Sequence, residues 1–239
     1  DDLGLDFNRV KTGQLSASIG VERRGETGST FGLAIKAERL EVADTPDRFI
    51  TDFFPADDPI LNEAKSFGSL LVTYSYEGAD NKAYPTRGMF FDLLAGATTN
   101  LNDTDRSYGF VIPSLEFYNA LIPSRKLVLR TQIQGHFNIG DNYEFYQAAV
   151  LGANTGLRGY RLQRFSGESA LAFSADLRLD VTKFKTGLLP LKLGVFGGYD
   201  IGRVWFDGED SNTWHDSVGG GLILTAVDSV PAQLGLFNS

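Results

Sequence analysis

The feature that most constrains the fold of this chain is a strict alternation of apolar and polar residues. In residues 127–138 the odd positions are mostly apolar, and the even positions carry side chains such as Arg130 and Gln132. Residues 30–38 and 171–181 repeat the pattern. Successive side chains of a β-strand point to opposite faces, so each segment has one apolar and one polar face. Helical periodicity is nearly absent, and we therefore expect an all-β protein.

Ten alternating segments are predicted to be antiparallel strands. They span residues 13–23, 30–41, 67–77, 88–99, 107–118, 126–138, 169–181, 189–205, 217–226 and 231–238. Pro113 interrupts the fifth segment and cannot donate a ladder hydrogen bond, so we expect a bulge or an edge position there.

Strand length and the pattern of connections favour a transmembrane β-barrel. A soluble β-sandwich would also alternate, and it remains the alternative. The strands are longer than the five or six residues usual in soluble sheets and can cross a bilayer when tilted. Short and long connections take turns, as expected of periplasmic turns and extracellular loops; the long ones are 42–66, 139–168 and 206–216, and only 100–106 breaks the rule. Charged residues on the polar faces suit a water-filled lumen.

Composition excludes several classes of protein. The net charge is −8, whereas nucleic-acid binding needs a basic face. There is no cysteine, so disulfides and thiolate metal sites are excluded. No apolar run is long enough for a transmembrane helix. The chain opens on Asp1-Asp2 without a signal peptide, and we expect a mature or internal segment.

Catalytic and metal-binding patterns are weak, and we predict no catalytic residue, metal or cofactor. His136 and His215 are interpreted as isolated polar residues. Ser166 lacks the Gly-x-Ser-x-Gly context of a nucleophile elbow. The acidic run at 207–210 does not have the spacing of a calcium loop and is interpreted as solvated.

The connection 139–168 is long, lacks periodicity and is therefore expected to be functional. It contains Arg158 and Gly159, and Asp176 and Asp200 lie at inward positions of the next two strands. A bidentate arginine–carboxylate contact could pin this loop inside a barrel, and Gly159 would allow the backbone to turn where a side chain could not fit. The pattern alone favours the simpler interpretation, a solvated loop arginine.

Five short motifs resemble, in order, the C-terminal part of the BamA/TamA-type outer-membrane barrel superfamily, also called the bacterial surface antigen family. They are the turn Tyr84-Pro85-Thr86-Arg87-Gly88, the run 145–152, the tip Leu157-Arg158-Gly159-Tyr160, the strand 174–178 and the strand Gly198-Tyr199-Asp200-Ile201-Gly202. Each motif is weak alone, but five in the right order make the resemblance specific.

This resemblance implies an extracellular lid loop that folds into the barrel lumen. Arg158 would pair with Asp200, Asp176 would be a second acceptor, and Tyr160 would pack nearby. Asp at 176, where the family commonly has Glu, shortens the reach of that second contact. Barrels of this family have sixteen strands, of which these ten would be the sixth to the fifteenth. Residues 1–239 would then form a single, incomplete outer-membrane barrel domain.

The implied function is protein insertion or translocation in the outer membrane of a Gram-negative bacterium, through a multi-pass barrel that catalyses no bond chemistry. Its partners would be outer-membrane lipid, unfolded outer-membrane or secreted polypeptides, and periplasmic accessory domains or lipoproteins. Residues 161–169 and 202–215 resemble barrels of Bacteroidetes-like bacteria, some of which follow a metallophosphoesterase domain. An alternative is therefore a membrane anchor or pore for an upstream enzymatic domain. A third possibility, a passive porin, conflicts with a lid in the lumen.

Overall fold

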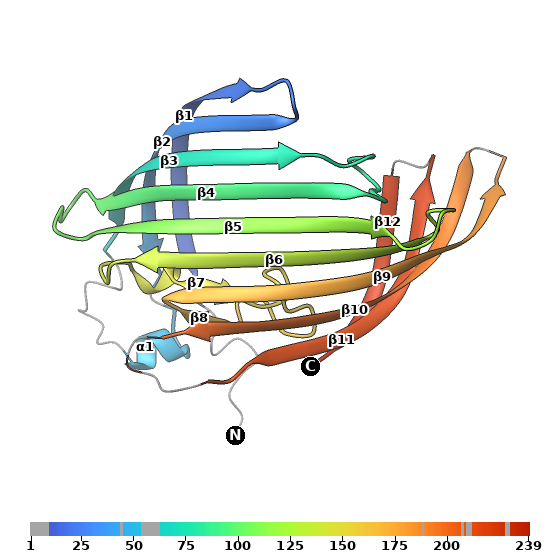
Figure 1. The fold of residues 1–239 in the computed structure, drawn as a ribbon. Coiled ribbons are helices and arrows are strands. Elements are labelled where there is room, and N and C mark those ends of the chain that lie inside the picture. Colours follow the sequence, from blue (N-terminus) through green and yellow to red (C-terminus); the bar gives the residue numbers. More distant parts are fainter. Residues whose placement is uncertain are drawn as a thin grey trace.

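Ten long strands form one antiparallel sheet in which every neighbour in sequence is a neighbour in space (Figure 1). The computed structural model describes residues 10–43, 45–53, 63–187, 189–206, 208, 212–227 and 230–239. In sheet order the strands are β1 (Thr12–Arg24), β2 (Ser29–Val42), β3 (Lys65–Glu77), β4 (Gly88–Asn100), β5 (Ser107–Ala120), β6 (Leu127–Ile139), β9 (Ser169–Lys185), β10 (Pro190–Trp205), β11 (His215–Ala226) and β12 (Val230–Asn238). The ten predicted strands are confirmed.

The loops contain four short elements that alternation did not predict. They are α1 (Phe49–Phe53), the 3-10 helix η1 (Phe145–Gln147), β7 (Ala149–Leu151) and β8 (Phe165–Gly167). β7 pairs with β8 in a separate two-stranded sheet. The long loop, residues 140–168, is therefore a folded hairpin.

The largest difference between a predicted and an observed strand is at the C-terminal end of β9, which continues four residues beyond the predicted end at Val181. A bulge in the pairing with β10 is the cause. Leu193 pairs with Thr182 and Gly194 with Asp180, so Val181 has no partner on β10 and forms a bulge. A bulge shifts the alternation by one residue. The alternating pattern therefore stops at Val181, although the strand continues to Lys185.

The expectation for Pro113 was wrong. β5 lies between β4 and β6, and the register with β6 is the same before and after the proline. Only Ile112 and Pro113 lack a recorded partner on β6, whereas Pro113 pairs with Leu93 on β4. Because proline has no N–H, the ladder loses local pairing without a bulge.

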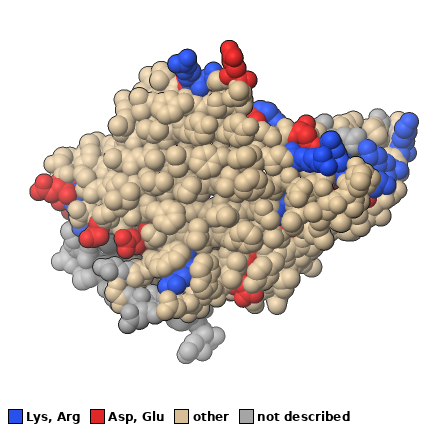
Figure 2. All heavy atoms as spheres, in the orientation of Figure 1, with Lys and Arg blue, Asp and Glu red and all other residues tan. Residues whose placement is uncertain are grey.

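The two faces of the sheet differ as the alternation predicts. Ile133, Leu177 and Leu222 on the convex face are 46%, 45% and 53% exposed. Figure 2 shows this face as a band almost free of charged atoms, with Lys, Arg, Asp and Glu gathered toward its two ends. The concave face carries the polar residues that alternate with them.

The two ends of the sheet also differ. At one end the joins are tight, as at 25–28 and 78–87, and we call this end the turn rim (Figure 1). At the other end, the loop rim, lie the joins 43–64 and 140–168. Within the described ranges, no helix has the length and apolar character needed to cross a membrane.

Candidate functional site

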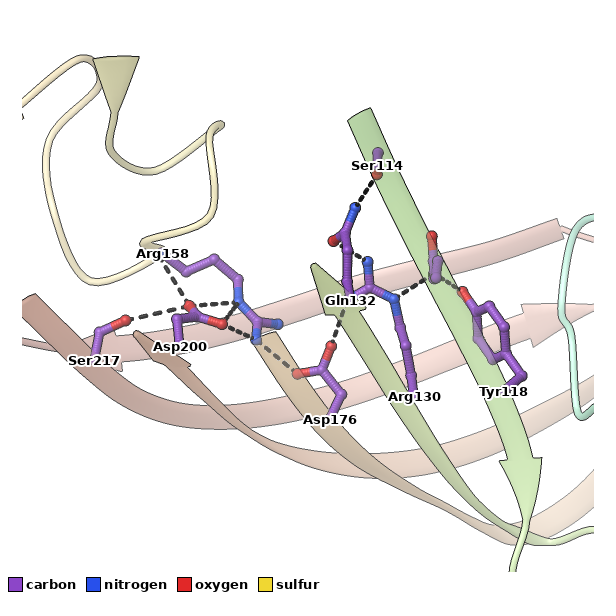
Figure 3. Close-up of polar contacts among 9 residues, drawn as sticks. Ser114, Tyr118, Arg130, Gln132, Arg158, Asp176, Asp200 and Ser217 are labelled. Carbon is purple, nitrogen blue, oxygen red and sulfur yellow. Dashed lines mark hydrogen bonds and ion pairs between the residues drawn. The ribbon is translucent and has the colours of Figure 1, made fainter. Parts of the chain in front are cut away.

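Arg158, at the tip of loop 140–168, is bound by two carboxylates of the concave face (Figure 3). Its Nε lies 2.9 Å from Asp200 Oδ2, and its Nη2 lies 2.6 Å from Asp200 Oδ1. The backbone N–H of Arg158 donates to the same carboxylate at 3.0 Å. Nη2 also donates to Asp176 Oδ1 at 2.7 Å, so the shorter aspartate does reach the guanidinium.

Because Asp200 is buried, it needs charged and hydrogen-bonding partners. Asp200 is 0% exposed, and the Arg158 side chain is 25% exposed. A carboxylate removed from water is costly unless it is paired and hydrogen-bonded. Ser217 donates a further hydrogen bond to Asp200 Oδ2 at 3.2 Å. We call Arg158, Asp176, Asp200 and Ser217 the arginine cluster.

A second arginine extends the cluster across the sheet (Figure 3). Arg130 on β6 is the cross-strand partner of Asp176, and its Nη1 lies 2.9 Å from Asp176 Oδ2. Its Nε donates to Glu116 Oε1 at 2.5 Å, and Tyr118 donates to the same oxygen. Asp176 therefore lies between two guanidinium groups, and hydrogen bonds to both of them fix its orientation.

Glycines on the concave face make the space that the guanidinium occupies. Gly198 pairs with Asp176 on one side and with Gly219 on the other. A Cβ at Gly198 would lie 2.8 Å from Arg158 Nη2. The same Cβ would lie 2.3 Å from Asp176 Oδ1, so a side chain at this position would force the ends of Asp176 and Arg158 to shift.

The rest of the tip packs on β11 and β12. Gly159 N donates to Ser217 Oγ at 3.3 Å, and Tyr160 Oη donates to the carbonyl of Asp216 at 3.2 Å. Gly159 has no positive φ; a Cβ there would instead lie 2.7 Å from Ser217 Cβ and 3.0 Å from the carbonyl carbon of Asn238. Gly159 lies in a turn in which Tyr160 N donates to the carbonyl of Leu157 at 3.2 Å, and the close approach of Ser217 and Asn238 leaves no room for a side chain, as expected.

The loop has its own apolar core against the sheet. Leu157 and Leu151 are 0% and 2% exposed and form a cluster with Ala170 and Ala172 of β9. Gly202, the last residue of its motif, leaves room for Leu151: a Cβ there would lie 3.0 Å from Leu151 Cδ1. The loop therefore lies on the concave face by burial as well as by charge.

Glu144 anchors the base of the same loop and was not predicted. The side chain is 8% exposed, and its Oε1 accepts hydrogen bonds from Lys65 Nζ at 2.8 Å and Arg106 Nη1 at 3.1 Å. Asn138 at the end of β6 donates to the carbonyl of Gln147 at 3.1 Å. The loop is thus held at both its base and its tip.

The predicted turn folds onto the concave face at the turn rim. Tyr84 is 5% exposed, and its hydroxyl donates to Asp180 Oδ1 at 2.6 Å. The Arg178 guanidinium stacks on the Tyr84 ring at 3.7 Å and donates to the carbonyl of Pro85. Burial raises the pKa of Tyr84, and the neighbouring Asp180 adds to this shift, so the phenol remains protonated.

Asp80 closes this turn. Its carboxylate accepts hydrogen bonds from Thr86 N and Oγ1 and from Arg87 N, and pairs with Arg125. Partial burial opposes ionisation, but these donors and the Arg125 cation outweigh it and hold the pKa of Asp80 below its ordinary value. Gly88 ends the turn with φ +116°, a conformation that other residues rarely adopt.

Sequence reasoning missed the residues that support the arginine cluster. Alternation places Arg130 on the face of Asp176, but strand pairing is needed to show that they are opposite each other. His215 is not isolated, because it stacks on Phe165 of the loop at 3.8 Å. No group of three metal-binding side chains occurs among the described residues. The acidic run at 207–210 lies largely outside the residues that the structure describes.

The comparisons with known proteins agree with this architecture. Residues 3–227 match the model of the Omp85 superfamily domain. The crystal structure of BamA from Haemophilus ducreyi lacking POTRA domains 1–3 is similar, with a TM-score of 0.69 and 14% sequence identity. The match covers 95% of this chain and 55% of that chain, so this chain spans about half the length of its structural relative. No curated protein matches the chain.

Proposed function

Because the chain belongs to the Omp85 superfamily, whose barrels reside in the bacterial outer membrane, we propose that it assists the insertion or export of polypeptides there. Its partners would be outer-membrane lipid, unfolded outer-membrane or secreted polypeptides, and periplasmic accessory domains or lipoproteins. We assign no bond chemistry to residues 1–239.

The proposed architecture is a single barrel domain to which these ten strands contribute part of the wall. A barrel of sixteen strands would include them as the sixth to the fifteenth, with β1 and β12 joined to further strands. Two observations support this proposal: β1 and β12 are the two ends of the strand order, and the structural match covers 55% of a longer chain. Loop 140–168 would be the lid inside the lumen.

The observation that carries the functional proposal is the arginine cluster. A porin keeps an open aqueous channel, whereas here a folded loop is pinned across β9, β10 and β11 by a buried ion pair. In our proposal Arg158, Asp176 and Asp200 act as a latch. Releasing it would open the lumen or loosen the strands that it spans, so that a client strand could add to an exposed edge.

The test compares Arg158→Ala with Arg161→Ala in the full-length protein, expressed in its own bacterium. Arg161 is an exposed arginine of the same loop tip and is a matched control for lost charge. We expect Arg158→Ala to lower the amount of folded client barrels or secreted polypeptide, and Arg161→Ala to behave as wild type. The level of the barrel in the outer membrane is measured in parallel.

Two outcomes would contradict the proposal. If both variants behaved equally and nearly as wild type, the Arg158 contacts would not act as a latch. If the barrel serves only as an anchor or pore for an upstream enzymatic domain, Arg158→Ala would release the loop but would leave the assembly of client polypeptides unchanged. Conductance in a planar bilayer distinguishes the proposed barrel from a porin. We expect small, flickering currents that rise when residues 140–168 are deleted, whereas a porin would give a large, steady current.

A further inference from the structure

We propose that Phe237 and Phe196 are positioning residues that couple the Arg158 latch to the Tyr84 turn, so that the loop rim and the turn rim release together. This inference deepens the proposed function, since it gives the lid a partner at the periplasmic end.

The first contact of this path joins the loop tip to the edge strand. The Arg158 guanidinium lies over the Phe237 ring of β12, with Cζ 4.1 Å from the ring centroid. An aromatic face attracts a cation, and the attraction is stronger when both are withdrawn from water. Phe237 thus forms the apolar wall of a guanidinium whose polar side is bound by Asp200 and Asp176.

The second contact joins the two phenylalanines. Their ring centroids are 6.3 Å apart, within the range of interacting aromatic pairs. Glycines clear the space for both rings: a Cβ at Gly219 would lie 2.5 Å from Phe237 Cγ, and one at Gly235 would lie 2.7 Å from Phe196 Cζ. In the run Gly219–Gly221 only Gly219 faces one of these rings, whereas a Cβ at Gly220 or Gly221 would meet backbone atoms of β10 or β12.

The third contact joins Phe196 to the turn. Tyr84, Phe196 and Ile223 form one buried cluster, with Phe237 packed against it. Tyr84 is itself held by Arg178, by Asp180 and by Lys192, whose Nζ lies 4.2 Å from the ring centroid. The turn at one rim and the latch at the other therefore contact the same aromatic pair.

Close packing gives this path a mechanical consequence. Protein interiors are packed as densely as organic crystals, so a ring can move only when its neighbours move. Withdrawal of Tyr84 would leave a cavity beside Phe196, and the surroundings of a new cavity relax partly into it. Phe196 and then Phe237 would shift toward the turn rim, and Arg158 would lose its apolar wall.

Two cysteine reporters can test the coupling, because the chain contains no cysteine. Ala172→Cys lies on β9 beneath the loop core, and Ala172 is 0% exposed. Thr225→Cys lies on β11 opposite Lys192, which contacts Tyr84, and Thr225 is 1% exposed. Each is labelled with a maleimide in the full-length protein in lipid vesicles, after cysteines outside this chain are replaced by serine.

We expect Tyr84→Ala to raise the labelling rate of the cysteine at 172 by roughly fivefold or more, the lower end of typical coupling between two sites. Because coupling is reciprocal, Arg158→Ala should raise labelling of the cysteine at 225 by a similar factor. In a Phe237→Leu background, Tyr84→Ala should no longer change labelling at 172. Phe117→Ala, on the convex face where Phe117 is 44% exposed, is the matched aromatic control and should change neither rate.

Tyr84→Ala that raises labelling at 225 and leaves 172 unchanged would overturn the coupling. If Tyr84→Ala fails to give a folded, heat-modifiable barrel, Tyr84→Phe replaces it. This variant removes only the hydroxyl bond to Asp180, and it should change both reporters in the same direction. Labelling needs no client polypeptide, so a failure of the proposed function, seen as normal client assembly in Arg158→Ala, is distinguishable from a failure of the coupling.

Discussion

Truncation of Arg158 should release loop 140–168 from the sheet, and the size of the effect follows from burial. Asp200 is 0% exposed and accepts hydrogen bonds from Arg158 Nε, Nη2 and N. Breaking a buried pair by removing one partner costs about 3–5 kcal/mol, because the other charge is left uncompensated. Arg158 is 25% exposed, so water can partly replace it, and Ser217 still donates to Asp200. We therefore take the lower figure, about 3 kcal/mol.

A loss of about 3 kcal/mol corresponds to roughly 150-fold more frequent opening of the loop. The assay is the labelling rate of a cysteine at Ala172, which is buried beneath the loop. Arg158→Lys keeps the charge but not the bidentate geometry and should give an intermediate rate. Asp200→Asn in the Arg158→Ala background should restore part of the protection, since the unpaired buried charge is then gone.

The reasoning would be refuted if Arg158→Ala changed the labelling rate less than about fivefold, because that factor corresponds to only about 1 kcal/mol. It would also be refuted if Arg161→Ala, which removes an exposed arginine, had an equal effect. In either case the apolar core of the loop, rather than the ion pair, would hold it in place.

Four further predictions concern other parts of the molecule. Glu144→Gln should loosen the base of the loop without releasing its tip; limited proteolysis of residues 140–168 measures this, and a cleavage rate equal to wild type would contradict it. Gly198→Ala should weaken the latch, because its Cβ would lie 2.8 Å from Arg158 Nη2; wild-type labelling at 172 would show that the arginine tolerates it. The pKa of Asp80 is lowered in the folded turn, so its contribution to stability is present above its unfolded pKa of about 3.9 and is lost as the pH falls through the folded value; the amide protection factors of the turn, which correct for the pH dependence of intrinsic exchange, should fall at low pH, and Asp80→Asn should remove that dependence. The polypeptide in the outer-membrane fraction should have an intact mass well above 26.1 kDa; a mass near that value would contradict the sixteen-strand architecture.

The alternation of apolar and polar residues was sufficient to predict the strands, because the direction of each side chain depends only on its place along its own strand. A strand that faces lipid on one side and water on the other must place apolar residues at every second position. The ten strands were therefore predictable, and the pattern ended at Val181 because a bulge exchanges the faces there. Pro113 was misjudged, since the sequence does not show that an interior strand can lose one ladder bond and keep its register.

The arginine cluster was predictable only in part. Spacing and resemblance pointed to Arg158, Asp200 and Asp176, because their motifs occur in a fixed order along the chain. The sequence alone did not identify Arg130, Glu144 or Phe237 as partners, since nothing local marks them. Their roles depend on which strands are adjacent and in which register.

The sequence by itself therefore determined which residues lie on the polar, concave face, where the strands lie and which loop carries the arginine. Each of these follows from a repeat of two residues or from a short contiguous motif. Only the tertiary structure decided that Arg130 and Arg158 share Asp176, and that Phe237 of β12 lies between the loop and Phe196. These contacts join strands that are distant in sequence, and they form only when the sheet curves and brings its concave face around the loop.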